Sequence, residues 1–200
     1  RCDILAGKES AASFTDKSYK GSKAFTINAG ATTTVSVECR VNNVIAAVAF
    51  DATIADQFST FEAKVGGELT EGKALTFNSS SASVGYFTLD KNTTALQWQF
   101  SGTHVKYGAF TKTGSIEGVE KGKKYNLAFT YTKGTPEGDL KFDIAVVKTT
   151  EDINDNIIFE ADPTGVAAVG KWEVWATHAT LKANVSESEF GSEGIAIQVR

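Results

Sequence analysis

The sequence predicts an all-β protein, an antiparallel β-sandwich of about ten to twelve short strands with at most one or two short helical turns. Apolar and polar residues alternate with a period of two in many segments, turn-forming residues separate these segments, and no three-turn helical pattern stands out. The clearest alternation runs from Val35 to Val41, where Val35, Val37, Cys39 and Val41 share one face. This segment predicts a strand with one buried face and one solvent-exposed face.

The segment from Ala24 to Phe50 is expected to form the centre of the fold. Asn42-Asn43 follows the alternating strand and suits a turn, because Asn tolerates the left-handed conformation that hairpin turns need. The run from Val44 to Phe50 has no polar face, which is typical of a strand covered on both sides. The sequence therefore predicts a central hairpin of these two strands.

The same periodicity places the other elements. Ile54 and Phe58 lie four apart in 51–59, which favours a short helical segment there. A second strong hairpin is predicted over 124–147, and 8–23 reads as a long connection. Further strands are expected at 2–6, 25–27, 61–65, 75–77, 86–89, 96–100, 107–112, 172–185 and 195–199.

Length and charge limit the possible classes. The 200 residues are expected to form a single β-sandwich domain over 1–200, with two small lobes and a seam near 101–119 as the alternative. The net charge of −4 and the lack of a Lys/Arg run argue against a nucleic-acid partner. No apolar window is long enough for a membrane-spanning helix, so we expect no membrane span.

The chain begins at Arg1, ends at Arg200 and contains no Met. These features predict a processed or trimmed chain, so the missing leader says nothing about export.

Two cysteines leave two interpretations open. Cys2 and Cys39 form a disulfide if their strands face each other, as suits an exported protein. Alternatively, both are free thiols packed as small apolar residues.

Signatures of catalysis are weak in this sequence. His104 and His178 have no recognisable nucleophile or acid pattern around them, and no CxxC, HExxH or GxSxG motif occurs. A glycoside hydrolase needs only two carboxylates that meet in space, so it remains a less favoured alternative. We expect a non-enzymatic protein without a cofactor.

Asp152, Asn154 and Asn156 have the spacing that begins a calcium-binding loop. The sixth and twelfth positions of that loop are Ile157 and Pro163, where an EF-hand requires Gly and Glu. A solvated acidic loop without metal is the favoured interpretation.

Aromatic side chains are the remaining indication of ligand binding. Trp98 shares a face with Leu96 and Phe100, so we expect it in the core. Trp172 and Trp175 lie three apart, which places one of them on an exposed face unless a bulge intervenes. Packing in the core or an interface is the favoured interpretation for these two Trp side chains. With Tyr107 they are the candidates for a surface that stacks against sugars.

A resemblance to a known family is carried by the segments 21–30, 34–42, 48–50, 61–65, 85–87, 122–125 and 172–179. They resemble an uncharacterised family of exported lipoproteins from gut Bacteroidetes, which is similar in architecture to fimbrillin-like pilins and adhesins. The resemblance implies a non-catalytic protein at the bacterial cell surface that acts through protein or host-surface contacts. Some neighbours of that family are carbohydrate-related, so a carbohydrate-binding module is the alternative, with a surface glycan as the partner.

Overall fold

The computed structural model is mostly β, with strands in three sheets and one short helix, so the predicted fold class is confirmed. It divides into two compact units. The first unit comprises 1–8, 17–42 and 154–200, and the second comprises 9–16 and 43–153. Side chains are described as far as Glu160, and the backbone over 1–26, 33–80, 84–134, 142–169, 173–183 and 195–199.

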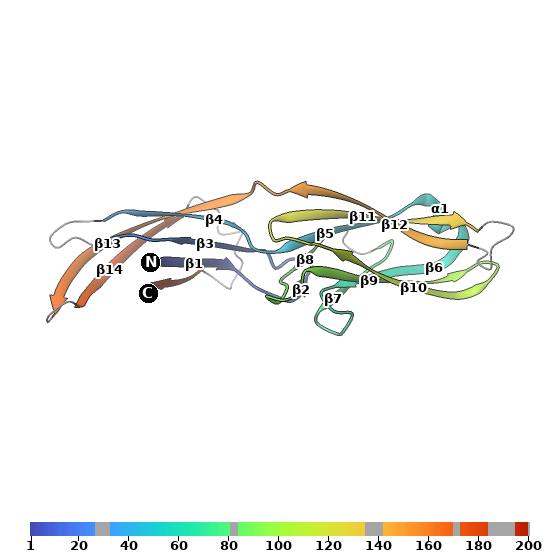
Figure 1. The fold of residues 1–200 in the computed structure, drawn as a ribbon, viewed down its shortest axis with the longest axis horizontal. Helices are drawn as coiled ribbons and strands as arrows, with labels where there is room; N and C mark the ends of the chain where they lie inside the picture. The colour runs from blue at the N-terminus through green and yellow to red at the C-terminus, as the bar shows by residue number, and fades with distance from the viewer. Residues whose placement is uncertain (27–32, 81–83, 135–141, 170–172, 184–194, 200) are drawn as a thin grey trace. The chain divides into compact units, whose positions relative to one another are not determined.

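The first unit contains a six-stranded sheet in the order β14-β13-β4-β3-β1-β15, and all of its pairs are antiparallel. Figure 1 shows both ends of the chain on strands of this sheet. Cys2, Ile4, Val37, Cys39 and Phe159 are among the side chains buried in this unit. The strands are β1 (Cys2–Gly7), β3 (Ser18–Lys23), β4 (Val35–Val41), β13 (Asn156–Val169), β14 (Glu173–Ala183) and β15 (Ile195–Val199).

The second unit is a sandwich of two sheets. A five-stranded sheet has the order β12-β11-β5-β8-β2, and a four-stranded sheet has the order β10-β9-β6-β7. The pair β5–β11 is parallel and the others are antiparallel. The strands are β2 (Ala12–Ser13), β5 (Val44–Phe50), β6 (Phe58–Gly66), β7 (Ala74–Phe77), β8 (Val84–Phe87), β9 (Ala95–His104), β10 (Gly108–Glu117), β11 (Lys123–Lys133) and β12 (Phe142–Asp152).

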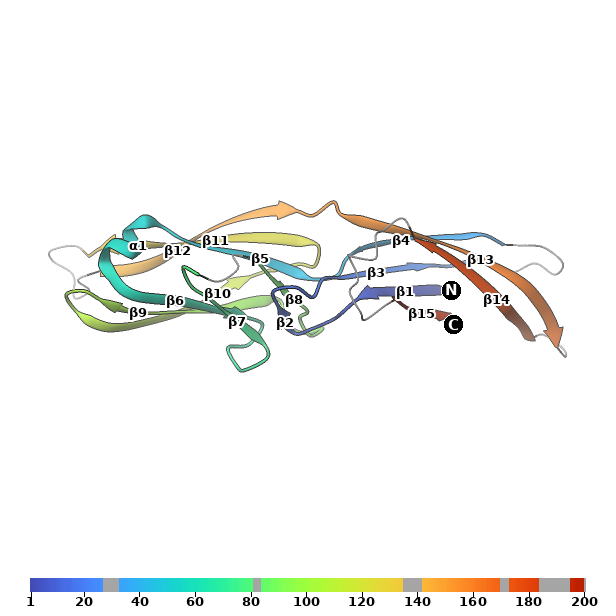
Figure 2. The same cartoon turned by 180° about the vertical axis from the view of Figure 1, so that it is seen from behind.

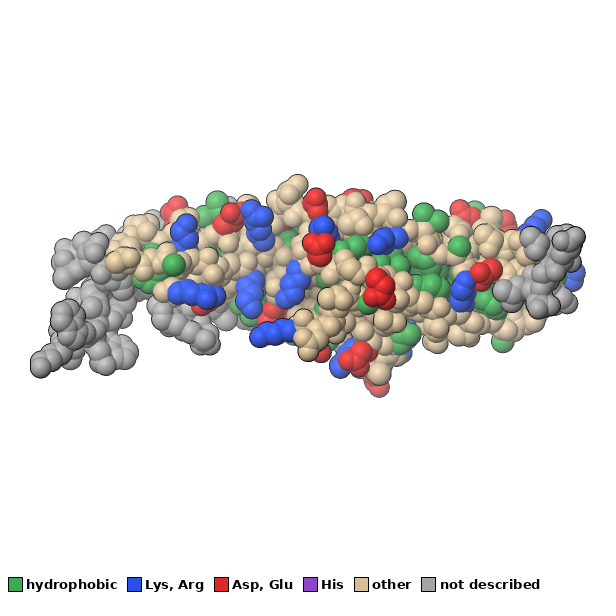
Figure 3. Space-filling view, viewed as in Figure 1, with side chains coloured by type: hydrophobic (Ala, Val, Ile, Leu, Met, Phe, Trp, Pro, Cys, Tyr) green, Lys and Arg blue, Asp and Glu red, His purple; other side chains and the backbone are tan. Residues whose placement is uncertain are grey.

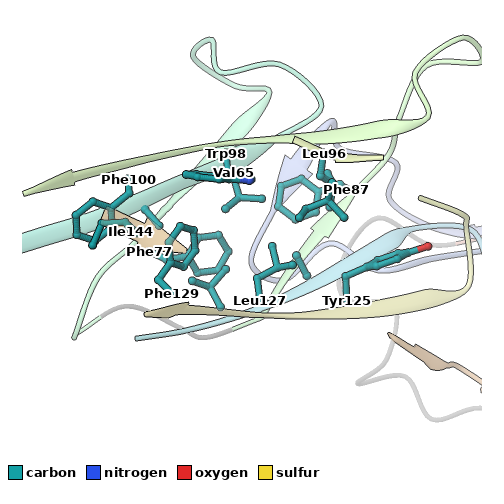
Figure 4. Packing of buried hydrophobic residues seen from close by; sticks show 14 of the residues in the cluster. Val65, Phe77, Phe87, Leu96, Trp98, Phe100, Tyr125, Leu127, Phe129 and Ile144 are labelled. Atoms are coloured by element: carbon teal, nitrogen blue, oxygen red, sulfur yellow. The ribbon is translucent and has the colours of Figure 1, made fainter. Parts of the chain in front are cut away.

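The core of the second unit lies between its two sheets. Trp98 of β9 packs edge-on against Phe129 of β11, with ring centroids 5.5 Å apart, and Phe100 stacks on Phe129 at 6.0 Å. Figure 4 shows side chains from both sheets meeting in this layer. Burial of large apolar side chains stabilises such a core by about 1.5–3 kcal/mol each. The predicted core position of Trp98 is confirmed, since it is only 7% exposed.

The predicted short helical segment is confirmed as α1 (Ala52–Gln57). Asp51 caps its N-terminus by accepting a hydrogen bond from the Thr53 backbone N–H at 3.0 Å. Ile54 is fully buried, and Phe58 follows the helix as the first buried residue of β6. Figure 2 shows α1 at the same end of the second unit as the β9–β10 turn, and the Val105 N–H donates to the Gln57 carbonyl at 2.9 Å. No helix of the described residues is long and apolar enough to cross a membrane.

The predicted central hairpin is wrong. β4 pairs with β3 and β13 in the first unit, whereas β5 pairs with β8 and β11 in the second. Asn42 and Asn43 are buried where an exposed hairpin turn was expected. The Asn42 N–H donates to the Ser18 carbonyl at 2.8 Å, and the Asn43 carbonyl accepts from Gly122 at 2.9 Å. These backbone groups therefore bond to partners distant in sequence. Ser18 lies in the first unit and Gly122 in the second, so the chain passes from one unit to the other between Asn42 and Asn43.

The segment 8–23, predicted as a connection, contains β2 and β3. β3 lacks regular alternation, and it is held as a strand by pairing with β1 and β4. The strand predicted over 25–27 is absent at Phe25, and Ile27 lies outside the described residues. Neighbouring strands decided the conformation here rather than local pattern.

The second predicted hairpin is confirmed, since β11 and β12 pair antiparallel without interruption. The residues 101–119, where a seam was considered, run through β9 and β10 inside the second unit.

Candidate functional site

The outer edge of the five-stranded sheet is the most distinctive surface of the second unit. β12 is the terminal strand of that sheet, and among the strands that the structure describes only β11 pairs with it. At Ile144 this edge is closed, because the Lys112 Nζ donates to the Ile144 carbonyl at 2.8 Å and to both Asp143 carboxylate oxygens at 2.7 Å. The Ile144 N–H in turn donates to Asp143 Oδ1 at 2.8 Å. Both backbone groups of Ile144 therefore point away from β11 and are satisfied.

The same geometry fixes the direction of the backbone further along β12. Pairs of an antiparallel ladder alternate between hydrogen-bonded and non-hydrogen-bonded, and the register with β11 is continuous from Phe142 to Asp152. Because Ile144 points outward, Val146, Lys148 and Thr150 also direct their N–H and C=O groups outward. Within the described part of the chain, no residue bonds to these outward groups. The edge is closed at Ile144 and open beyond it.

Side chains around the open edge are exposed and of mixed character. Val147 is 55% exposed, although it is a large apolar residue. The Lys148 Nζ lies 5.8 Å from the centre of the Tyr125 ring and has no described carboxylate partner. Glu151 accepts from Asn126 at 2.6 Å and lies 3.4 Å from Lys124 Nζ, and the Asn126 bond is the main cause that lowers the pKa of its carboxyl. Acidic and basic side chains are interspersed over the face shown in Figure 3.

An aromatic cluster lies at the turn between β9 and β10. His104 is buried, and its Nδ1 accepts from the backbone N–H groups of Lys106 at 3.0 Å and Tyr107 at 3.3 Å. The His104 ring stacks on Phe142 at 4.5 Å, and the Nε2 lies 3.5 Å from the Tyr131 hydroxyl. Through these two hydrogen bonds the imidazole holds the backbone of the turn.

Of the predicted sugar-stacking residues, the structure describes the side chain of Tyr107. It is 40% exposed, and its ring stacks on Phe142 at 5.7 Å with an interplanar angle of 18°. Trp172 lies outside the described residues. Trp175 lies in β14 opposite Ala167, and its side chain is among those not described.

A hollow of about 350 Å³ opens beside α1 in the second unit. Val48, Phe50, Phe61 and Phe77 line it, and the rings of Phe50 and Phe61 are 5.0 Å apart. A space of this size and apolar lining can take one or two apolar side chains of a partner.

The calcium-like residues each have separate surroundings. Asp152 belongs to the second unit and lies 4.0 Å from Lys123 Nζ, while Asn156 in the first unit donates to Glu38 Oε1 at 3.0 Å. Asn154 is exposed. No group of three or more His, Cys, Asp or Glu side chains suited to a metal occurs among the residues that the structure describes.

Asp155, within the same sequence segment, has a structural role in the first unit. It accepts hydrogen bonds from Lys17 Nζ and from the Tyr19 hydroxyl, the latter at 2.8 Å. The Lys17 bond is the main cause that lowers the pKa of Asp155, with partial burial opposing it. This carboxylate ties the start of β3 to the segment before β13.

Cys2 and Cys39 are buried free thiols in the structure. Burial is the main cause that raises the pKa of Cys39 to about 11, and the charge of Cys2 adds to it. The disulfide between Cys2 and Cys39 stays a prediction.

Sequence reasoning missed the open edge because it ended the returning strand near Val147. The apolar alternation stops there, and the residues from Thr149 onward were interpreted as an acidic loop. Thr149 and Thr150 were the available signal, since β-branched residues favour extended backbone.

The fold and these surfaces define a β-rich protein with an open edge on β12 and an aromatic cluster at the turn between β9 and β10. The chain belongs to the family described as a domain of unknown function (DUF4493), whose model matches residues 3–160. That description names neither a lipoprotein nor a pilin. No curated protein and no solved structure matches the chain.

Proposed function

We propose that this protein is a non-catalytic, exported protein of the bacterial cell surface that acts through contacts with other proteins. The observation that carries the proposal is the open edge of β12 at Val146, Lys148 and Thr150. An unpaired strand edge offers a row of donors and acceptors to an extended segment of another chain, which binds as an added strand. Val147 beside this edge is exposed, and the hollow near Phe50 has apolar side chains in its lining. Both can make apolar contacts with a partner protein.

The edge can be blocked by one substitution that spares the fold. Proline has no N–H, and the Thr150 N–H has no described partner to lose, so Thr150→Pro removes a donor from the edge alone. Lys106→Glu, at the exposed β9–β10 turn, is the control variant because it leaves β12 unchanged.

The test measures binding of the wild-type chain to immobilised fibronectin, laminin and collagen and to a glycan array. We expect protein binding that Thr150→Pro abolishes and Lys106→Glu retains. Release of reducing sugar from a polysaccharide would show catalysis and overturn the proposal. If the Thr150→Pro variant binds the immobilised proteins as the wild type does, the binding does not use the edge of β12, and that part of the proposal is wrong.

Carbohydrate binding is the second candidate, and Tyr107 favours it. The residue is 40% exposed, its ring stacks on Phe142 at 5.7 Å, and the Lys106 Nζ lies 5.4 Å from the ring centre. An exposed aromatic ring held by a second ring is suited to stacking against a sugar. Glycan binding that Tyr107→Ala abolishes and Thr150→Pro retains would establish this candidate in place of the first.

A further inference from the structure

We infer that the open edge of β12 pairs with the β12 edge of a second copy of this chain, antiparallel and about a two-fold axis at Thr150. This inference rests on the proposed function, because it names one protein partner for the same edge. The pairing joins the two five-stranded sheets into one continuous sheet.

The direction of the backbone groups limits the registers that can form. In an antiparallel pair, the residues that exchange two hydrogen bonds must both direct their N–H and C=O groups outward. Thr150 does so, and it can lie opposite Thr150 of the second copy. The same register brings Lys148 opposite Asp152, which also points outward because it lies two residues beyond Thr150.

The side chains favour this register. Lys148 lies opposite Asp152 of the second copy, and the symmetry repeats the pair, so two opposite-charge pairs flank the axis. Within its own chain Asp152 has only a 4.0 Å approach to Lys123, and Lys148 has no described carboxylate partner.

The apolar residues match as well. In the same register Val147 lies opposite Ile153 of the second copy, on the other face of the sheet. Val147 is 55% exposed in the single chain, and Ile153 is partly exposed. Both lose apolar surface to each other on pairing, which favours association.

Neighbouring registers lack these matches. An axis at Lys148 brings two ammonium groups together, and an axis at Glu151 brings two carboxylates together, both of which are unfavourable. An axis at Thr149 pairs Lys148 with Thr150 and Val147 with Glu151, so neither charge nor apolar surface is matched.

The limit of the paired segment also follows from the structure. Lys112 occupies the outward carbonyl of Ile144 at 2.8 Å, and Asp143 occupies its N–H at 2.8 Å. A second strand can therefore add only beyond Ile144, which places the axis in the distal half of β12.

Sedimentation velocity over a wide range of protein concentration tests the inference. We expect a wild-type dimer, no dimer for Thr150→Pro, and a dissociation constant raised about tenfold for Lys148→Glu, since two like-charge pairs replace two attractive ones. The double variant Lys148→Glu/Asp152→Lys restores both opposite-charge pairs with the two charges exchanged. It should dimerise with the wild-type dissociation constant. Lys106→Glu makes the same charge change near the Phe142 end of β12, away from the segment between Lys148 and Asp152, and should leave the dimer unchanged.

Two folding controls keep the test interpretable. Thr150→Pro should retain the wild-type circular dichroism spectrum and melting temperature of the monomer. Thr149→Pro should lower the melting temperature, because its N–H points toward β11 and takes part in the ladder. A Thr150→Cys variant under mild oxidation should give a reducible covalent dimer, whereas Thr113→Cys on β10 should not.

The outcomes separate the two proposals. A wild-type chain that stays monomeric at all concentrations, or a dimer indifferent to Thr150→Pro, overturns the self-pairing. If the chain is monomeric but Thr150→Pro still abolishes binding to another protein, the self-pairing fails and the proposed function stands. A dimer without binding to any other protein or surface supports the self-pairing and removes the proposed function.

Discussion

Lys112 and Asp143 link the two sheets of the second unit. Lys112 lies in β10 of the four-stranded sheet and Asp143 in β12 of the five-stranded sheet, and the Nζ lies 2.7 Å from both carboxylate oxygens. The same ammonium group satisfies the outward carbonyl of Ile144 at 2.8 Å. One side chain thus joins two sheets and closes one position of a strand edge.

Removing this link should destabilise the second unit modestly. We expect Lys112→Ala and Asp143→Ala each to lower the free energy of unfolding by about 1 kcal/mol, because both side chains are over a third exposed and water screens the pair. A double-mutant cycle in urea should give a coupling of about 0.5–1 kcal/mol. The control pair Lys73–Glu68, at 2.7 Å but more exposed, should couple less. A coupling no larger than that of the control would contradict a role for Lys112 in joining the sheets.

Gly21 should not tolerate a side chain. A Cβ at this position would lie 2.2 Å from the Glu38 carbonyl oxygen and 2.8 Å from the Cys39 Sγ. Gly→Ala often gains about 0.4–1 kcal/mol through the unfolded state, but the backbone clash between β3 and β4 outweighs it. We expect Gly21→Ala to destabilise the first unit by about 1–3 kcal/mol, as overpacking does. Ser22→Ala, exposed on the same strand, should change stability by less than about 0.5 kcal/mol, and an equal loss in both variants would count against the clash.

Acid should weaken the first unit in part through Asp155. Its pKa is lowered in the folded chain, mainly by the hydrogen bond from Lys17, so its contribution is fully present above the unfolded pKa of about 3.9 and is lost as the pH falls through the folded pKa. We expect Asp155→Asn to reduce the unfolding free energy at neutral pH by less than about 1 kcal/mol, since the carboxylate is 45% exposed.

The comparison of wild type and Asp155→Asn should therefore converge at low pH, where both side chains are neutral. Urea titrations at several pH values measure this difference, with the exposed Asp56→Asn as the control. A difference that persists unchanged in acid would show that the substitution acts through packing and not through the charge.

The two thiols should be unreactive in the folded chain. Burial raises the pKa of Cys39 to about 11 and also raises the pKa of Cys2, so little thiolate exists at pH 8. A disulfide-exchange reagent should label both thiols in denaturant and neither in buffer. If non-reducing denaturant releases no reactive thiol and the intact mass is lower by two hydrogens, the disulfide between Cys2 and Cys39 has formed.

Much of the fold followed from alternation that local residues carry. The hairpin of β11 and β12, the helix α1 and the core position of Trp98 were predicted, because each depends on the spacing of residues close in sequence. The strand β3 was missed because Ser18–Lys23 becomes extended only through its pairing with β1 and β4.

Period-two alternation is enough to predict that the chain forms strands and, in most cases, where they lie, because burial of every second residue needs no knowledge of partners. The tertiary structure sets which strands pair. It separated β4 from β5 at two buried asparagines, and it left β12 at a sheet edge that is closed at Ile144 and open at Val146, Lys148 and Thr150. Backbone hydrogen bonds are chemically alike at every residue, so their partners are chosen by packing between distant segments.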